Sequence, residues 1–416
     1  MIITKAPKGT EDLLPKDSYR WHYIEGKFRD TAKNYCYKEI RVPTFEHTEL
    51  FERGVGDTTD VVEKQMYTFL DKGGRSVTLR PEGTASVARS FLQNNLYADT
   101  LPLKMWYELP CFRYENKQKG RLREFHQFGV EVFGAKGPEI DAEVVSFALE
   151  FLQKAGLSDM SVNVNSIGCP ECRKKYNDIL KDYIRPNLSE LCDTCKSRFE
   201  RNPLRILDCK SPICQDIVKN APRLLDYICD DCKKHFDGFL KNLDDMGIKY
   251  TIDSGIVRGL DYYTKTVFEI ISGDFTVCGG GRYDGLIEEF GGDKTPAIGF
   301  GLGIERLLLR LDELNVEIPK SDNPKIYIAP LGDAAKKEAK KLVLKLRQSG
   351  ISAETDYMER GLKPQMKYSD KIGAEYTLVL GDTEIETGKI RIKNMQSGEQ
   401  TELELNDIIA FFEGDR

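Results

Sequence analysis

Eight of the eleven cysteines of this chain lie between Cys169 and Cys232, whereas Cys36, Cys111 and Cys278 stand alone. The first residues, Met1 to Lys8, lack the apolar run and cleavage site of a secretory signal, so we expect a cytoplasmic protein. In a reducing compartment such a cluster favours bound metal or free thiols over disulfides. The cysteine-rich stretch is therefore expected to fold as a small unit around metal or around reduced thiols.

The cysteine spacing is compatible with two four-thiolate sites of the kind that bind structural zinc. Grouping in chain order gives one site from Cys169-x2-Cys172 with Cys192-x2-Cys195, and a second from Cys209-x4-Cys214 with Cys229-x2-Cys232. Other pairings, including interleaved ones, fit the same sequence. Four thiolates complete the coordination of zinc, so a catalytic metal is not expected here.

Length and charge narrow the class of protein. At roughly 100–200 residues per domain, 416 residues predict two to four domains. The chain has 61 basic and 67 acidic residues, a net charge of −6, so any nucleic-acid contact must depend on local basic patches. No apolar run approaches the roughly 20 residues that span a bilayer, and we expect no membrane association.

A proline-flanked linker and a cysteine-rich stretch divide the chain into three parts. A linker between Pro319 and Pro324 precedes residues 325–416, which alternate short strands and helices and predict a small α/β domain. Residues 169–249 are helical in pattern and interrupt the body as a cysteine-rich insertion domain. The flanking blocks, 1–168 and 250–318, mix strands and helices without regular βαβ alternation, which favours an α+β domain with an antiparallel sheet.

A strongly basic stretch follows Cys111. Five basic residues and one acidic residue lie between Arg113 and Arg123, around Gly120, which predicts a hairpin loop. Guanidinium groups bind phosphate through two parallel hydrogen bonds, so this hairpin suits a nucleotide phosphate and an RNA end. A solvated basic hairpin fits the same pattern.

Four further stretches combine polar and glycine residues in ways that suggest a ligand pocket. They are Arg80-Pro81-Glu82-Gly83-Thr84, Arg258-Gly259-Leu260-Asp261-Tyr262-Tyr263, Cys278-Gly279-Gly280-Gly281-Arg282-Tyr283-Asp284, and Gly299-Phe300-Gly301-Leu302-Gly303-Ile304-Glu305-Arg306. The glycines allow a ligand to approach the backbone closely. Each stretch alone also fits ordinary packing, with Tyr262 and Tyr263 as core aromatics.

Taken together and in this order, these stretches resemble the class II aminoacyl-tRNA synthetases and, within them, the histidyl-tRNA synthetase family. Motif 1, the dimer-interface strand, resembles Arg41-Val42-Pro43-Thr44-Phe45-Glu46; motif 2 is the Arg113 hairpin and motif 3 ends at Arg306. The stretches at Arg258 and Arg282 resemble the histidine-specific signatures. The four histidines form no His-x-x-His pair, so the class I signature is absent.

The resemblance implies a histidine–tRNA ligase that uses ATP with Mg²⁺, L-histidine and tRNA(His), and acts as a homodimer. It implies catalytic roles for Arg113 and Arg258. The implied ATP-binding residues are Arg113, Glu115, Arg121, Phe125 and Arg306. The implied histidine-binding residues are Glu82, Gly83, Thr84, Arg113, Gln127, Glu131, Arg258, Tyr262 and Tyr263. Gln118 is expected at the tRNA acceptor end, and residues 325–416 as an anticodon-binding domain.

Several alternatives stay open. Glu131 could be an exposed strand residue, Gln118 a bare loop tip, and the lysines between Lys336 and Lys345 a solvated helix face. His126 is expected on the opposite face of its strand, in a structural role. A non-catalytic paralogue, the regulatory subunit of ATP phosphoribosyltransferase, shares the architecture but usually lacks the C-terminal domain and the phosphate-gripping arginines. An RNA-binding or interaction protein on the same scaffold is a third possibility.

Overall fold

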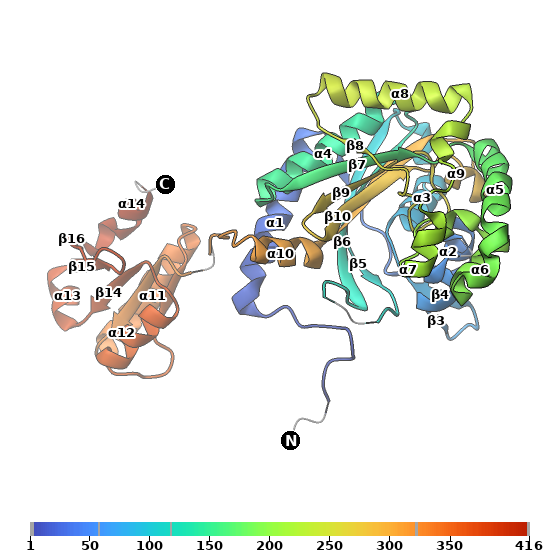
Figure 1. Cartoon of the computed structure of the whole chain (residues 1–416). Coiled ribbons are helices and arrows are strands. Elements are labelled where there is room, and N and C mark those ends of the chain that lie inside the picture. The colour runs from blue at the N-terminus through green and yellow to red at the C-terminus, as the bar shows by residue number, and fades with distance from the viewer. Residues whose placement is uncertain (1–3, 57–58, 117–118, 321–322, 414–416) are drawn as a thin grey trace. The chain divides into compact units, whose positions relative to one another are not determined.

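The computed structural model describes residues 4–56, 59–116, 119–320 and 323–413 (Figure 1). The chain forms two compact units, Met1–Ile318 and Pro319–Arg416. Within the described residues no helix combines the length and the apolar character that crossing a bilayer would require.

The large unit is built on an eight-stranded sheet in which only the outer pairs, β1–β5 and β7–β8, are parallel. Across the sheet the strands are β1 (Lys38–Glu39), β5 (Leu103–Phe112), β6 (Glu124–Phe133), β11 (Ala297–Gly303), β10 (Phe275–Arg282), β9 (Thr264–Ser272), β7 (Met160–Ser166) and β8 (Thr251–Ile252). A separate sheet holds β2 (Phe45–His47), β4 (Ser76–Leu79) and β3 (Tyr67–Leu70). The predicted antiparallel α+β architecture is confirmed.

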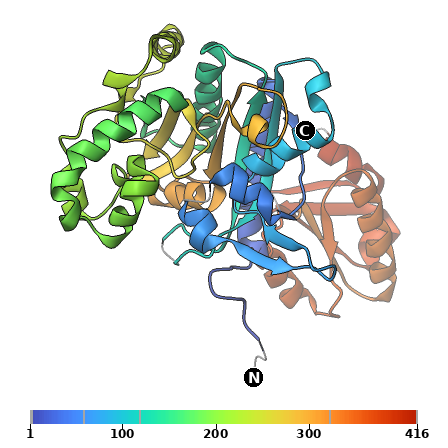
Figure 2. The same cartoon turned by 90° about the vertical axis from the view of Figure 1, so that its right-hand side faces the viewer.

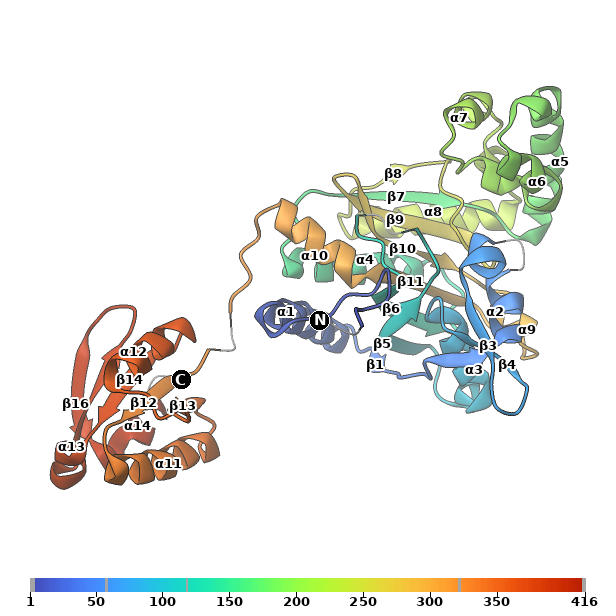
Figure 3. The ribbon, with the colours of Figure 1, turned by 90° about the horizontal axis from the view of Figure 1, so that it is seen from below.

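Alternation along β6 gives the large sheet two different faces. Phe128, Val130 and Val132 join one hydrophobic core with α1, α4, α8 and α10, of which α1, α4 and α10 lie close together in Figure 3. By the same alternation, Gln127, Gly129 and Glu131 face the other side. The remaining helical segments of the large unit outside the insertion are α2, α3, α9, η1 and η2. Their bounds are α1 (Pro15–Asn34), α2 (Thr48–Val55), η1 (Val61–Gln65), α3 (Thr84–Gln93), η2 (Leu96–Ala98), α4 (Glu139–Ala155), α9 (Leu286–Glu289) and α10 (Ile304–Glu313).

The insertion between β7 and β8 is helical, as predicted. It consists of α5 (Pro170–Ile184), η3 (Arg185–Glu190), α6 (Asp193–Arg201), η4 (Pro203–Ile206), α7 (Pro212–Val218), η5 (Leu224–Tyr227) and α8 (Asp230–Asp245). Helices α5, α6 and α7 stand together at one end of the large unit (Figures 1 and 2), whereas α8 returns along the sheet and packs on α4. Buried Asp141 of α4 accepts hydrogen bonds from Arg282 at 2.8 Å and binds His235 of α8 at 2.8 Å.

The small unit is a five-stranded sheet with helices, the α/β domain that its sequence predicts. Its strands run in the order β13 (Ala353–Thr355), β12 (Ile326–Pro330), β14 (Tyr376–Leu380), β15 (Lys389–Asn394) and β16 (Gln400–Glu404). Its helical segments are α11 (Asp333–Gln348), α12 (Leu362–Lys371), α13 (Asp382–Thr387), η6 (Leu405–Asp407) and α14 (Ile408–Glu413). Ala339, Leu342 and Leu346 of α11 are buried, which leaves its lysines on the outer side.

Candidate active site

Glycines in the middle of the sheet make room for larger side chains. A Cβ added to Gly279 would lie 2.2 Å from Nη2 of Arg258, and one added to Gly301 would lie 2.2 Å from Nε2 of Gln127. At Gly299, opposite Glu131 in the β6–β11 register, a Cβ would meet Oε2 of Glu131 at 2.0 Å. The glycine-rich stretches therefore accommodate side chains of the site.

Glu131 is fully buried and surrounded by hydroxyl groups, so the interpretation as an exposed strand residue is wrong. It accepts hydrogen bonds from Oγ1 of Thr84 at 2.7 Å, from the hydroxyl of Tyr107 at 3.0 Å and from the hydroxyl of Tyr283. Burial raises the pKa of Glu131 to about 8, although Tyr283, Thr84 and Tyr107 oppose that rise. Tyr107 was not singled out from the sequence, where it is one aromatic in an apolar strand.

The start of α3, which carries Thr84, also brings Glu82 and Gly83 close to this carboxylate. Buried Glu82 accepts hydrogen bonds from the backbone amides of Thr84 and Ala85, both at 2.8 Å, and burial raises its pKa. The amide of Gly83 donates to Oε1 of Gln127 at 3.1 Å. Glu82, Gly83, Thr84, Gln127 and Glu131 therefore form one connected cluster that is rich in acceptors and buried except at Gln127, which is partly exposed.

Arginines from different parts of the sequence meet beside the hairpin of β5 and β6. Oε2 of Glu115 lies 3.3 Å from Nη1 of Arg121, and its Oε1 lies 3.9 Å from Nη1 of Arg113. Arg306, at the start of α10, donates to the backbone oxygens of Gly120 and Thr276, both at 3.3 Å. Burial, Arg121 and Arg113 lower the pKa of Arg306, because the positive charges repel one another at close range.

Phe125 lies beside this group of arginines. The guanidinium of Arg113 lies 5.3 Å from the centre of the Phe125 ring, and its Nε donates to the carbonyl of Pro81 at 2.8 Å. The guanidinium of Arg113 thus touches the segment that carries Glu82. Gln118 falls outside the described residues.

Arg258 enters the site from a backbone in the left-handed region, at φ of 64°. Its guanidinium donates to Glu269 of β9 and lies 5.8 Å from the centre of the Tyr263 ring, which is packed on Tyr262. Burial works against the charge of Arg258, but Tyr263 and Glu269 raise its pKa above the ordinary value. Glu269 was missed in the sequence because one acid in an alternating strand carries no signal.

His126 lies on the opposite face of β6, as expected. Its amide and its Nδ1 contact Glu305 at 2.8 and 3.0 Å, and its ring meets Trp21 edge-on at 4.8 Å. A cavity of about 1030 Å³ on this side is lined by Trp21, His126 and Glu305, and by neither Glu131 nor Arg258.

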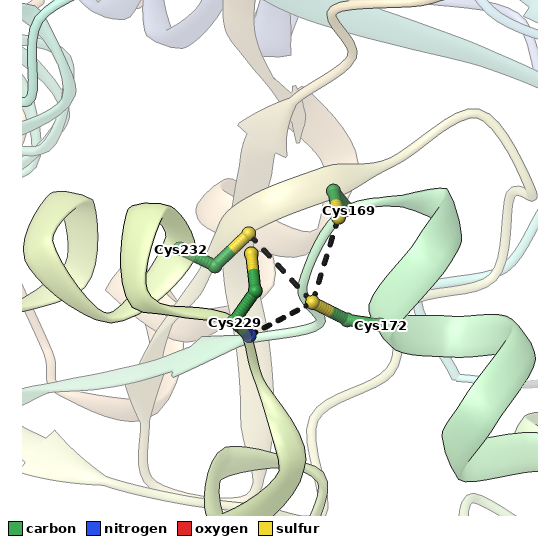
Figure 4. A group of neighbouring side chains, drawn as sticks. All are labelled: Cys169, Cys172, Cys229 and Cys232. Atoms are coloured by element: carbon green, nitrogen blue, oxygen red, sulfur yellow. Dashed lines mark hydrogen bonds between the residues drawn. The ribbon is translucent and has the colours of Figure 1, made fainter.

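The eight clustered cysteines form two groups, but not the two expected from chain order. The root cluster joins Cys169 and Cys172 to Cys229 and Cys232 (Figure 4), and the outer cluster joins Cys192 and Cys195 to Cys209 and Cys214. The chain-order grouping is wrong because the chain returns from the insertion at the start of α8, and this helix start lies beside the start of α5, where the insertion begins. The nested pairing belongs to the alternatives that the spacing left open.

Both clusters have the dimensions of a four-thiolate metal site. The Sγ atoms lie 3.5 Å apart in Cys169–Cys172, 4.0 Å in Cys172–Cys232 and 3.8 Å in Cys192–Cys209. A tetrahedral site with Zn–S bonds of about 2.3 Å places its sulfurs about 3.8 Å apart, whereas a disulfide requires about 2 Å. All eight thiols are free, and either cluster could hold a metal ion.

Known proteins match this chain over nearly its whole length. A family model described as histidyl-tRNA synthetase matches residues 9–171 and 215–307, and one described as anticodon binding domain matches residues 325–414. The unmatched residues 172–214 lie within the insertion. The histidine–tRNA ligase of Clostridium novyi (strain NT) is 59% identical over 407 residues, which cover 98% of this chain and 98% of that protein.

Two further relatives agree. The histidine–tRNA ligase of Acetivibrio thermocellus is 57% identical over 413 residues, 98% of this chain and 99% of that protein. The crystal structure of apo histidyl-tRNA synthetase from S. aureus is 42% identical, with a TM-score of 0.85 and coverage of 99% of this chain and 100% of that one. The chain belongs to the histidyl-tRNA synthetase family of the class II aminoacyl-tRNA synthetases.

Proposed function

We propose that this histidine–tRNA ligase binds the triphosphate of ATP with the arginines that meet beside the β5–β6 hairpin. The observation that carries the proposal is the convergence of Arg113, Arg121 and Arg306 from distant parts of the sequence, close enough to lower the pKa of Arg306. Charge moves from the α-phosphate toward pyrophosphate as histidine attacks, and guanidinium groups fixed in advance stabilise that transition state.

Each residue of the arginine group has a role in this proposal. Arg113 and Arg258 act on the α-phosphate, and Arg306 and Arg121 hold its β,γ end. Phe125, stacked with Arg113, supports the adenine, and Glu115 faces its amino group. Mg²⁺ bound together with ATP would offset part of the negative charge of the phosphates.

The buried acceptor cluster suits L-histidine. Glu82, Thr84 and Gln127 supply acceptors for the α-ammonium group, with Gly83 at the same turn. Glu131, together with Tyr263 and Tyr262, faces the imidazole. A buried carboxylate pairs best with a ligand that brings N–H groups, and such sites reject analogues without them by roughly 10⁴-fold.

We further propose tRNA(His) as the acceptor substrate, with Gln118 at its 3′ end and the small unit at its anticodon. Because the reaction uses ATP and tRNA, we place the enzyme in the cytoplasm.

A homodimer is supported by the motif 1 resemblance of Arg41–Glu46 and by exposed Phe45 and Phe69, which share one face of the β2–β4–β3 sheet. Sedimentation should give twice the chain mass, and Phe45→Asp should shift it toward the monomer.

The two cysteine clusters are proposed to bind zinc as structural sites. Their support is the sulfur spacing and the backbone amides that donate to sulfur, from Cys229 to Cys172 at 3.1 Å and from Cys192 to Cys214 at 3.3 Å. We also propose three domains: a catalytic domain of residues 1–168 and 250–318, an insertion domain of residues 169–249 that carries both clusters, and an anticodon-binding domain of residues 325–416. Protein purified without chelator should contain two equivalents of zinc, one for each cluster.

ATP–pyrophosphate exchange with each of the twenty amino acids tests the catalytic proposal. Exchange should require histidine, and Arg258→Ala should abolish it while the protein stays folded. Arg391→Ala, a surface change in the small unit, is the matched control and should exchange normally. A regulatory paralogue of ATP phosphoribosyltransferase would give no exchange; the retained arginines and the small unit argue against that alternative.

A further inference from the structure

The insertion makes hydrogen bonds to Asp261, a residue of the segment that leads into the proposed histidine pocket. Nδ2 of Asn202, the residue that ends α6, donates to Oδ1 of Asp261 at 2.8 Å. Nη1 of Arg173, in the first turn of α5, donates to the Asp261 carbonyl at 3.4 Å. On the other side, the Asp261 amide donates to the carbonyl of Val55 at 3.2 Å. Asp261 is thus held between the insertion and the body of the large unit.

Asp261 lies in the segment that carries Arg258. A non-glycine residue at φ of 64° is strained, and such a conformation persists only where the surroundings hold it. Glu269 fixes the guanidinium end of Arg258, but it does not fix the backbone. The contacts to Asp261, three residues along the chain, supply that restraint just before Tyr262 and Tyr263.

The partners of Asp261 come from helices that begin at the cysteine clusters. Cys169 and Cys172 start α5, and Arg173 follows Cys172 directly. Cys192 and Cys195 start α6, at whose end Asn202 lies. The first turn of each helix therefore belongs to one of the two clusters.

We propose that the metal-loaded clusters position the proposed histidine pocket: by fixing α5 and α6, they hold Arg173 and Asn202 on Asp261 and thereby keep the Arg258 segment in its active conformation. Arg173, Asn202 and Asp261 are positioning residues in this scheme. The inference rests on the proposed zinc sites and on the proposed roles of Arg258 and Tyr263.

The test compares three variants of the full chain in histidine-dependent exchange, with zinc content measured on the same samples. Asn202→Ala breaks the contact but leaves both clusters intact, and α6 stays anchored because Arg198 binds Asp60 at 2.8 Å and Arg201 binds Glu63 at 2.5 Å. Cys192→Ser removes a ligand of the outer cluster. Lys196→Ala, on the exposed side of the same helix, is the matched control.

Asn202→Ala should keep two equivalents of zinc and lower kcat/KM for histidine by about tenfold. Cys192→Ser should lose one equivalent and show a similar defect, and Lys196→Ala should match the unmodified enzyme. Exchanging the partners, Asn202→Asp with Asp261→Asn, should restore much of the activity because the hydrogen bond re-forms in the reverse direction.

The possible outcomes distinguish a failure of this inference from a failure of the proposals on which it rests. Normal kcat/KM in Asn202→Ala with zinc retained would overturn the positioning role, whatever the metal. Zinc-free protein with normal exchange would overturn the role of the metal. Absence of histidine-dependent exchange in the unmodified chain would instead overturn the proposed function itself.

Discussion

At the scale of single residues, the raised pKa of Glu131 links the proposed histidine pocket to folding stability. The pKa of this carboxyl is about 8 in the folded protein against an ordinary 4.5. The folded state therefore binds the proton more tightly, and its stabilising effect is full below pH 4.5 and is lost as pH rises through about 8. Glu131→Gln removes this titration.

The free energy of unfolding of Glu131→Gln should rise relative to the unmodified protein between pH 5 and 8, by about 1.4 kcal/mol per pH unit at most. Urea denaturation at several pH values measures it. The same variant should bind histidine weakly, because an amide cannot replace the carboxylate acceptor. A difference in stability that does not change with pH would show that Glu131 is not protonated in the folded state.

Residues that belong to a motif could be proposed for the site from the sequence, whereas residues outside any motif could not. Arg113, Glu131 and Arg258 were found because their neighbours resemble a family signature. Tyr107 and Glu269 lie in strands where each fits ordinary alternation; the pairing of β5 with β6 places Tyr107 against Glu131, and the segment before β9 folds back to place Arg258 against Glu269. Such partners are fixed by tertiary register, which local sequence does not encode.

At the scale of elements, the glycines of β10 are expected to be as important as the side chains they accommodate. Gly279→Ala would put a methyl group 2.2–2.5 Å from the guanidinium of Arg258, which must then move. Because that group is the end of a flexible side chain, the protein should fold while kcat/KM for exchange falls by about 100-fold. Gly285→Ala, where nothing lies within 4 Å, is the control. Equal activity in both variants would contradict the role of Arg258.

The attachment of α8 to α4 depends on a buried ionic network. Arg282 and Asp141 are both fully buried, and Asp141→Ala removes the carboxylate that binds both Arg282 and His235, leaving Asp284 at 3.0 Å as a remaining carboxylate partner of Arg282. The free energy of unfolding should fall by about 3–5 kcal/mol. Asp159→Ala, which breaks a partly exposed pair with Arg310, should cost about 1 kcal/mol or less. Urea denaturation of both variants measures the two losses of stability. Equal losses would contradict the expectation that the buried pair contributes more than the partly exposed one.

Elements with strong local patterns were predicted and weakly patterned ones were not. The run Tyr376–Leu380 was expected as a strand and is β14. Strand β16, Gln400–Glu404, was missed because it is a polar, largely exposed edge strand without apolar alternation. The nested cysteine pairing was only one of several open alternatives, because it depends on the start of α8 returning to the start of α5 in the folded chain.

At the scale of the whole molecule, the two units should divide the reaction between them. Every residue assigned to ATP and histidine lies before Ile318, and each unit has its own hydrophobic core. A chain ending at Ile318 should therefore keep histidine-dependent exchange within about threefold but charge tRNA(His) at least about 100-fold more slowly. Loss of exchange in this shortened chain would show that the units are not independent.

The lysines of α11 decide how the small unit contributes. Lys337 and Lys340 are exposed on the helix face opposite its buried residues, where a solvated face and a phosphate-binding surface look alike. If these lysines contact the backbone phosphates of tRNA, reversing both charges with Lys337→Glu and Lys340→Glu should raise KM for tRNA about tenfold. The same double variant should weaken the salt dependence of that KM. Exchange needs no tRNA and should not change. An unaltered KM for tRNA would assign these lysines to solvent and move the anticodon contacts to another face of the unit.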